Sequence, residues 1–178
     1  MIGIQLCNEA EWNAKGMYGW YDNVAREVAG IDASVPLYIS DAWNLSEATK
    51  YCNGKNTLRA GQSNPIVIDT HLYWTFSEDD KQKSPRQIID EVPTKLRALD
   101  GHDGSVVDHG AAQVVIGEYS CVLSEPTWSK KGGEQKDDLV RAFGQAQSQR
   151  YQQRAGGSFF WTYKMVRCLP CSLLQRND

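Results

Sequence analysis

The stretch Pro-Ile-Val-Ile-Asp-Thr-His-Leu-Tyr-Trp at residues 65–74 places a short apolar run directly before a group of polar and aromatic side chains. An apolar, β-branched run of this length beside a proline is typical of a buried strand. Further apolar runs of this kind occupy residues 2–7, 35–40, 113–117 and 158–161, and segments with helical spacing lie between them at 17–31, 45–51, 84–99 and 137–155. Such alternation predicts a parallel sheet covered by helices.

Two architectures have this pattern, an open doubly wound sheet and a (β/α)8 barrel. The chain contains neither G-x-G-x-x-G nor G-x-x-x-x-G-K-[ST], so the nucleotide-binding versions of the open sheet lose support. Polar side chains follow every predicted strand, and barrel enzymes build their active sites at that end of the strands. We therefore expect an α/β fold, a partial TIM barrel with five of the usual eight strands.

One of the expected helices has clear boundary signals. Ser84 and Pro85, with Gln87 three residues after the serine, predict its start. Pro93 predicts a kink or a break inside it.

Composition excludes several classes of protein. The chain has 178 residues, 41% of them hydrophobic and 23% charged, which suits one globular domain. The net charge is −3 and the Lys and Arg residues are scattered, so we expect no nucleic-acid partner. No apolar run approaches the length of a membrane span, so we expect no membrane partner. Six Trp and eight Tyr against four Phe suit a surface that binds sugar rings, with the alternative that many of them pack in an ordinary core.

Cysteine usage and the first residues bear on compartment. The five cysteines do not have the spacing of a disulfide framework, and a lone Cys168-x-x-Cys171 is a weak zinc signal. The first residues lack the basic and apolar regions of an export signal. We expect the chain as written in the cytoplasm, although a longer parent could be secreted or reach the cell wall.

Two carboxylates are candidates for acid–base chemistry. Glu9 and Glu118 each follow a predicted strand, with three strand–helix units between them. Retaining glycosidases use one carboxylic acid to protonate the leaving oxygen and a nearby carboxylate to attack the anomeric carbon. The alternative is that both glutamates are solvated loop residues.

Four motifs in order resemble glycoside hydrolase family 5, in its fungal exo-β-1,3-glucanase branch. The motifs are Gly-Ile-Gln-Leu-Cys-Asn-Glu-Ala at 3–10, Asp-Thr-His-Leu-Tyr at 69–73, Val-Ile-Gly-Glu-Tyr-Ser at 115–120 and Gly-Ser-Phe-Phe-Trp-Thr-Tyr-Lys at 157–164. They are similar to the motifs of that family's fourth, sixth, seventh and eighth strands. The resemblance therefore implies that residues 1–164 form strands 4 to 8 of the barrel and that 165–178 is a divergent tail.

The resemblance also implies catalytic and substrate-binding roles. Glu9 would be the general acid/base, Glu118 the nucleophile, and Asn8 a hydrogen-bond partner of the sugar 2-hydroxyl. His71 and Tyr73 would hold Glu118 and the sugar.

Aromatic side chains would complete the sugar site. The resemblance implies that Trp161 forms the floor beneath the sugar. Asp41, Trp43 and Trp74 are further candidates for the rim of the site, with the alternatives that the two tryptophans pack inside the protein and that Asp41 caps a loop.

The function that the resemblance implies is retaining hydrolysis of β-1,3-glucan, with a glucan polysaccharide or oligosaccharide as partner and no cofactor. Because the first three strand–helix units of the family are missing, the alternative is a catalytically silent half-barrel that binds glucan or a complementing partner chain. Open sheet edges also predict self-association. The loop that contains His102, Asp103, Asp108 and His109 lacks the spacing of a preformed metal site, so we expect no metal.

Overall fold

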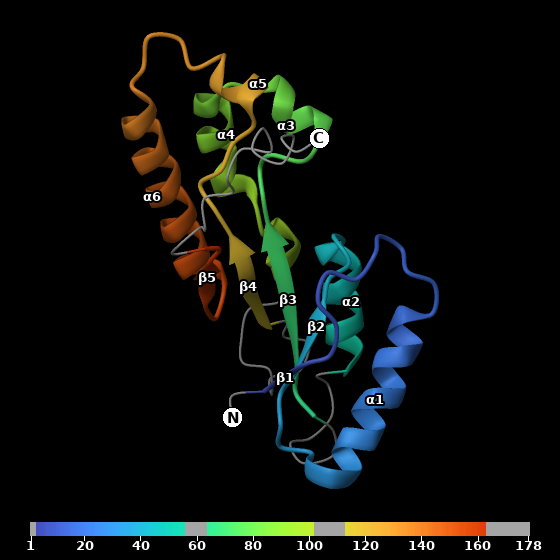
Figure 1. Ribbon diagram of the computed structural model, residues 1–178. Coiled ribbons are helices and arrows are strands. Elements are labelled where there is room, and N and C mark those ends of the chain that lie inside the picture. Colours follow the sequence, from blue (N-terminus) through green and yellow to red (C-terminus); the bar gives the residue numbers. More distant parts are fainter. Residues whose placement is uncertain (1–2, 56–63, 102–112, 163–178) are drawn as a thin grey trace, which may run out of the picture.

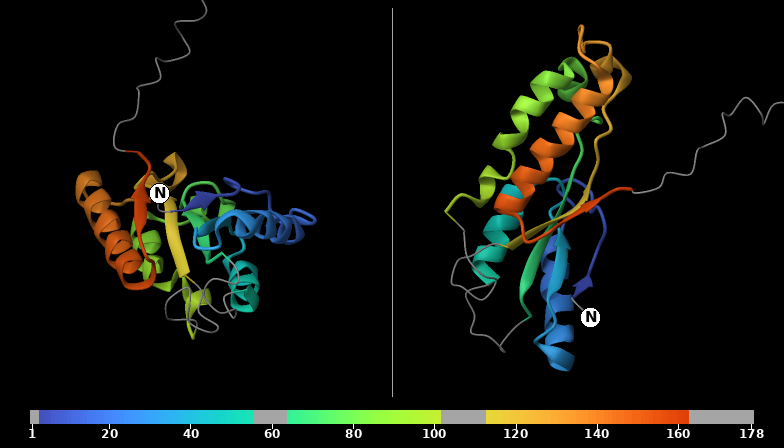
Figure 2. Two further views of the ribbon diagram at one scale, coloured as in Figure 1. Left: turned by 90° about the horizontal axis from the view of Figure 1, so that it is seen from below. Right: turned by 90° about the vertical axis from the view of Figure 1, so that its left-hand side faces the viewer.

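The structure, a computed structural model, describes residues 3–55, 64–101 and 113–162. Five strands form one parallel sheet in the order β1-β2-β3-β4-β5. They are β1 (Ile4–Gln5), β2 (Leu37–Ser40), β3 (Ile66–Leu72), β4 (Gln113–Tyr119) and β5 (Ser158–Phe160). The sheet curls into a half-barrel with alternating helices (Figures 1 and 2), which confirms the prediction of a partial α/β TIM barrel.

Helices connect successive strands. They are α1 (Met17–Asp32), α2 (Leu45–Lys55), α3 (Glu78–Gln82), α4 (Pro85–Glu91), α5 (Glu125–Trp128) and α6 (Lys136–Arg154), with 3-10 turns at Val92–Thr94 and Arg97–Leu99. In Figure 1, α1 and α2 lie on one side of the strands and α4 and α6 on the other. The short helices α3 and α5 were not predicted, because each has too few residues to give an apolar repeat. Their starts are nonetheless marked, since Ser77 and Ser124 each accept a backbone N–H as N-caps.

The boundaries of α4 agree with its sequence signals. The Ser84 side chain accepts from the Gln87 backbone N–H, and the Gln87 side chain accepts from the Ser84 N–H, which completes a capping box. Pro85 occupies the first turn. The α-helix ends at Glu91 and continues as a 3-10 turn through Pro93, so the predicted break is confirmed.

Two hydrophobic clusters hold the layers together. The first joins the strands to α1, α2 and the end of α6 through Tyr21, Leu37, Ile39, Ala48, Cys52, Ile66, Ile68, Leu96, Leu99, Val114, Ile116 and Tyr151. The second lies among α4, α5 and α6 and contains Trp74, Ile88, Ile89, Val92, Leu123, Trp128, Leu139 and Phe143. The first cluster thus holds β3 and β4 themselves, and the second holds the segments just after them, at Trp74 and Leu123.

The strands at the centre are longer than predicted. The sequence places the ends of β3 and β4 at Ile68 and Gly117, where the apolar runs stop, but pairing continues to Leu72 and Tyr119. His71 and Glu118 therefore lie inside the strands rather than after them. Polar side chains are tolerated there because they face one another, with Nδ1 of His71 3.6 Å from Oε2 of Glu118.

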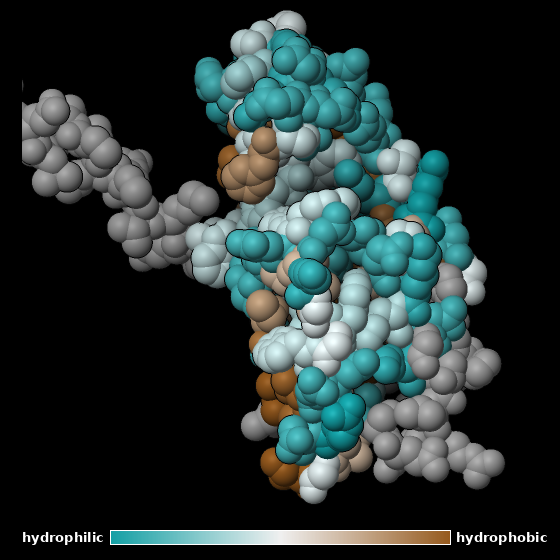
Figure 3. All heavy atoms as spheres, turned by 90° about the vertical axis from the view of Figure 1, so that its right-hand side faces the viewer, coloured by the Kyte–Doolittle hydropathy of each residue, from teal (hydrophilic) through white to brown (hydrophobic). Residues whose placement is uncertain are grey.

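The edges of the described sheet expose apolar side chains. β1 and β5 stand at the two ends of the strand order, and Ile4, Phe159 and Phe160 are between 38% and 57% exposed. The face that carries α1 and α2 is mainly hydrophilic, with hydrophobic side chains gathered along one edge (Figure 3). Among the described residues, no helix has the length and apolar character needed to cross a membrane. The predicted loop from 102 to 110 and the predicted tail at 165–178 lie outside the described residues.

Candidate active site

A β-bulge places the two central side chains of the site next to each other. Along β3 and β4, Thr70 pairs with Ile116, but the next pair is His71 with Glu118, so Gly117 is the extra residue on β4. A bulge changes which face the following side chains point to. Without it Gly117 would stand opposite His71, and with it Glu118 does.

His71 connects the two predicted catalytic carboxylates. Its Nδ1 atom is 3.0 Å from Oε1 of Glu9 and 3.6 Å from Oε2 of Glu118, and its Nε2 atom is 3.5 Å from Oδ2 of Asp69. Burial disfavours the charged imidazolium, but hydrogen bonding to Asp69 and Glu9 and the charge of Glu118 outweigh that effect and raise the pKa of His71 to about 9. At neutral pH His71 is therefore a cation among three acidic side chains.

Tyr73 donates a hydrogen bond to Glu118. It follows β3, and its hydroxyl donates to Oε2 of Glu118 at 2.6 Å. Burial and this hydrogen bond raise the pKa of Tyr73, because both favour the neutral phenol. Tyr73 thus remains a donor across the physiological range of pH.

Ser40, which the sequence analysis did not single out, links the loops after β1 and β2. Its Oγ accepts the N–H of Ala10 at 3.1 Å and the N–H of Ala42 at 3.2 Å. Ala10 follows Glu9, whose backbone is in the left-handed region with φ 46°. Ser40 therefore stabilises the turn that presents Glu9, a role that no local sequence signal reveals because its partner is thirty residues away.

Asp41 and Trp43 form the adjoining turn. Ala42 and Trp43 both have positive φ, at 48° and 62°, which is uncommon for residues with a Cβ. The buried Asp41 carboxylate accepts the Trp43 N–H at 3.0 Å and the Thr70 hydroxyl at 2.6 Å, and burial raises the pKa of Asp41. The half-exposed Trp43 ring stands edge-on to His71, with centroids 6.4 Å apart. Asp41 thus caps the turn and also lines the adjoining cavity, and Trp43 borders the cluster.

The remaining predicted site residues have different surroundings. Trp161 is 55% exposed just after β5, and its backbone N–H donates to the backbone carbonyl of Tyr119. Asn8 is exposed in the loop that carries Glu9. Trp74 is 1% exposed and packs edge-on against Phe143, so it belongs to the helical core, as the packing alternative predicted.

Glu9, His71 and Glu118 also have the donor atoms of a small metal site. One ligand atom from each lies within 4.8 Å of the others. Among the described residues, these three side chains are the one set of possible metal ligands that lie this close together. The same atoms contact one another directly, through the His71–Glu9 hydrogen bond and the His71–Glu118 ion pair. The other metal candidates, in the loop with His102 and His109, lie outside the described residues.

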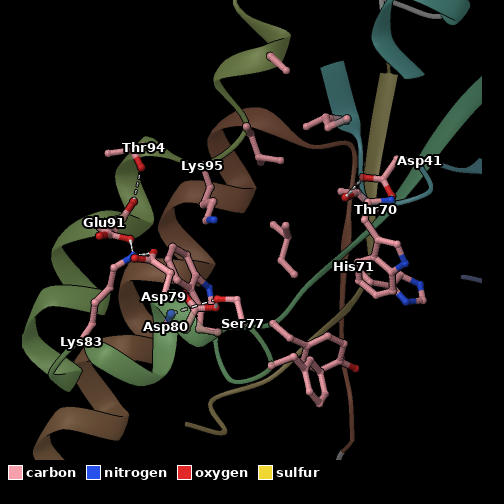
Figure 4. Close-up of a pocket in the computed structure, with 18 residues that line it drawn as sticks. Asp41, Thr70, His71, Ser77, Asp79, Asp80, Lys83, Glu91, Thr94 and Lys95 are labelled. Carbon is pink, nitrogen blue, oxygen red and sulfur yellow. Dashed lines mark hydrogen bonds and ion pairs between the residues drawn. The ribbon is translucent and has the colours of Figure 1, made fainter. Parts of the chain in front are cut away.

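A cavity of about 660 Å³ adjoins the cluster. In Figure 4, Asp41, Thr70 and His71 lie on one side of it, and side chains of the α3–α4 region lie on the other. Much of the charge on that far side is internally balanced, because Lys83 pairs with Asp79 and Glu91. The cavity thus extends the site away from the carboxylates toward a mixed polar and apolar wall.

Comparison with known proteins gives two informative similarities, although no protein-family model matches the chain. An uncharacterized glycosyl hydrolase of Saccharomyces cerevisiae is 32% identical over 165 residues, which is 91% of this chain and 30% of that protein. Glucan 1,3-beta-glucosidase 3 of Schizosaccharomyces pombe is 31% identical over 169 residues, 93% of this chain and 32% of that protein. The chain therefore spans about a third of the length of these curated relatives. Neither name specifies family 5, and together they support a glycoside hydrolase.

Proposed function

We propose that the cluster is the catalytic centre of a retaining glycoside hydrolase that acts on β-1,3-glucan, with Glu9 as acid/base and Glu118 as nucleophile. The observation that supports this most directly is the separation of the carboxylates, since an oxygen of each lies within 4.8 Å of the other. Retaining enzymes hold their two carboxyl groups about 5–5.5 Å apart, whereas inverting enzymes need about 6.5–9.5 Å to admit a water molecule.

In the first step, an oxygen of Glu118 forms a bond to the anomeric carbon while the glycosidic C–O bond breaks. Protonated Glu9 gives its proton to the departing oxygen, so the glucosyl group is left on Glu118 as an ester. The Tyr73 hydroxyl and the His71 imidazolium, both close to Oε2 of Glu118, hold that carboxylate in place.

In the second step, Glu9 acts as a base. It takes a proton from water while the water oxygen attacks the anomeric carbon and the bond to Glu118 breaks. The Glu9 side chain is 41% exposed and that of Glu118 is 22% exposed. The more exposed carboxylate is thus the one that must meet both the leaving group and the incoming water.

The sugar-binding residues are assigned on chemistry and on position. Trp43 borders the cluster with a half-exposed ring, and Trp161 is exposed at the end of the neighbouring strand β5, so both offer flat apolar faces of the kind that stack on sugar rings. We assign Asn8, beside Glu9, to the sugar 2-hydroxyl. The name of the Schizosaccharomyces pombe relative favours a β-1,3-linked glucose polymer as substrate.

The test is release of glucose from laminarin, a β-1,3-glucan, by the chain and by three variants. We expect Glu118→Gln and Glu9→Gln to lose turnover, and Glu27→Gln, which removes an exposed carboxylate on α1, to keep it. A retaining reaction releases the β-anomer first, which proton NMR detects before mutarotation. Release of the α-anomer, or full activity of Glu118→Gln, would refute the assignment.

A second candidate function, a catalytically silent half-barrel, is favoured by the edges of the described sheet. β1 and β5 offer backbone groups and exposed Ile4, Phe159 and Phe160 to another chain. This candidate predicts binding of laminarin, or association with a second copy or a complementing partner chain, without release of glucose. Sedimentation of the chain with and without laminarin, run beside the glucose assay, distinguishes the two functions.

A further inference from the structure

Asp69 is a buried acidic side chain that the proposed mechanism does not use. It is 6% exposed and lies on β3 two residues before His71, so both side chains point to the same face. Its Oδ2 atom accepts the Gln5 side-chain N–H at 2.5 Å and is 3.5 Å from Nε2 of His71. A carboxylate removed from water is costly unless a cation balances it, and His71 is the side chain placed to do so.

Gly117 provides the space that this carboxylate occupies. A Cβ atom at residue 117 would lie 1.9 Å from Oδ1 of Asp69, a distance that no real contact allows. Oδ1 has no hydrogen-bond partner within the described ranges. The carboxylate therefore packs against bare backbone on one side and reaches Gln5 and His71 on the other.

The same glycine is the extra residue of the bulge that turns Glu118 toward His71. One position thus has two consequences. It lets the Asp69 carboxylate reach Nε2 of His71, and it brings Oε2 of Glu118 to within 3.6 Å of Nδ1.

We propose that Asp69 is a positioning residue, which holds His71 in the doubly protonated form with Nδ1–H directed at Glu9 and Glu118, and that residue 117 is glycine so that this carboxylate fits. The protonation state of His71 does not depend on the proposed function. Only the description of the cluster as catalytic rests on the proposed function.

The charged groups that the structure places against His71 are four acidic side chains. Asp69 lies on the same strand, Glu9 in the loop after β1, Asp41 after β2 and Glu118 on β4. Of these, Asp69 meets Nε2 and the two glutamates meet Nδ1. Removing Asp69 therefore removes the partner of one ring nitrogen and leaves the partners of the other.

Nitrogen NMR of the chain labelled at histidine tests this without substrate. The chain has three histidines, at 71, 102 and 109, and His71→Gln assigns the signal. We expect both ring nitrogens of His71 to be protonated at pH 7.5. In Asp69→Asn we expect the His71 pKa to fall by about 1–3. Gly117→Ala should change it in the same direction, because the new methyl group displaces the carboxylate.

Asp138→Asn is the matched control, since it removes an exposed carboxylate on α6 and should leave the His71 signal unchanged. A neutral His71 at pH 7.5 in the unmodified chain would overturn the proposal even if the variants fail to fold. So would a folded Asp69→Asn with an unaltered His71 titration. Loss of glucan hydrolysis in the separate Glu118→Gln assay has no bearing on either result.

Discussion

The hydroxyl of Tyr73 donates a 2.6 Å hydrogen bond to Oε2 of Glu118, across the boundary between β3 and β4. The two residues are forty-five positions apart in the chain, and the parallel pairing of their strands brings them together. Oε2 is also the oxygen that faces His71. Oε2 of Glu118 therefore accepts one hydrogen bond, from Tyr73, and forms an ion pair with His71, and we expect the other oxygen to be the one that reacts.

Removing the Tyr73 hydroxyl tests whether its hydrogen bond holds Glu118 in place for the reaction. In an active preparation we expect Tyr73→Phe to lower kcat on laminarin by about 10², in line with the loss of one donor to a reacting group. Tyr51→Phe is the control, because Tyr51 also donates to a carboxylate, that of Asp22, but on the α1–α2 side of the molecule. Equal losses of kcat in the two variants would contradict a specific role for Tyr73.

The raised pKa of His71 predicts that stability depends on pH. The folded chain binds this proton more tightly than the unfolded chain, with a pKa of about 9 against the ordinary 6.5. The contribution to the free energy of unfolding is thus complete below about pH 6.5 and is lost as pH rises through 9. We expect urea unfolding to show that the difference between the unmodified chain and His71→Gln shrinks by roughly 3 kcal/mol over that interval. A difference independent of pH would contradict the assignment.

The Asp41 turn gives a prediction about stability. Truncation in Asp41→Ala leaves the Thr70 hydroxyl and the Trp43 N–H without their acceptor, so we expect a loss of about 1–3 kcal/mol in the free energy of unfolding. Thr70→Val, which removes one of the two hydrogen bonds, should cost less. If the double variant lost the full sum of both single losses, the shared hydrogen bond would be disproved.

The two tryptophans near β3 should behave in opposite ways. Trp74 is buried against Phe143, so Trp74→Ala should cost about 3–5 kcal/mol of stability. Trp43 is half-exposed, so Trp43→Ala should change stability by about 0.5 kcal/mol or less and should weaken laminarin binding. Urea unfolding and calorimetric titration with laminarin measure the two effects. A strong loss of stability in Trp43→Ala would assign that residue to packing instead.

Sequence reasoning reached the architecture because the signals for it are local. Apolar runs followed by polar residues give the five parallel strands, and Ser84 with Pro85 gives the start of α4. It stopped β3 and β4 too early, because it equated the end of an apolar run with the end of backbone pairing. His71 and Glu118 belong to the strands because pairing is decided by the neighbouring backbone, not by side-chain polarity.

Parts of the site depend on register and could not be predicted. Glu9, His71, Tyr73 and Glu118 were proposed from motifs, and the structure places their side chains within hydrogen-bond or ion-pair range of one another. The roles of Ser40 and Asp69 arise from contacts across strands, and the bulge at Gly117 arises from how β3 and β4 align. None of these contacts gives a signal in the sequence next to the residue concerned.

The hydroxyl of Ser40 has a consequence for how this site can change during evolution. The loop that carries Glu9 and the turn that carries Trp43 share this one acceptor, so any change that displaces the Ser40 hydroxyl disturbs both. We therefore expect substitutions in the two loops to be epistatic. A change that moves the Trp43 turn and takes the Ser40 hydroxyl with it should also displace the loop of Glu9, unless a compensating change in that loop restores the hydrogen bond.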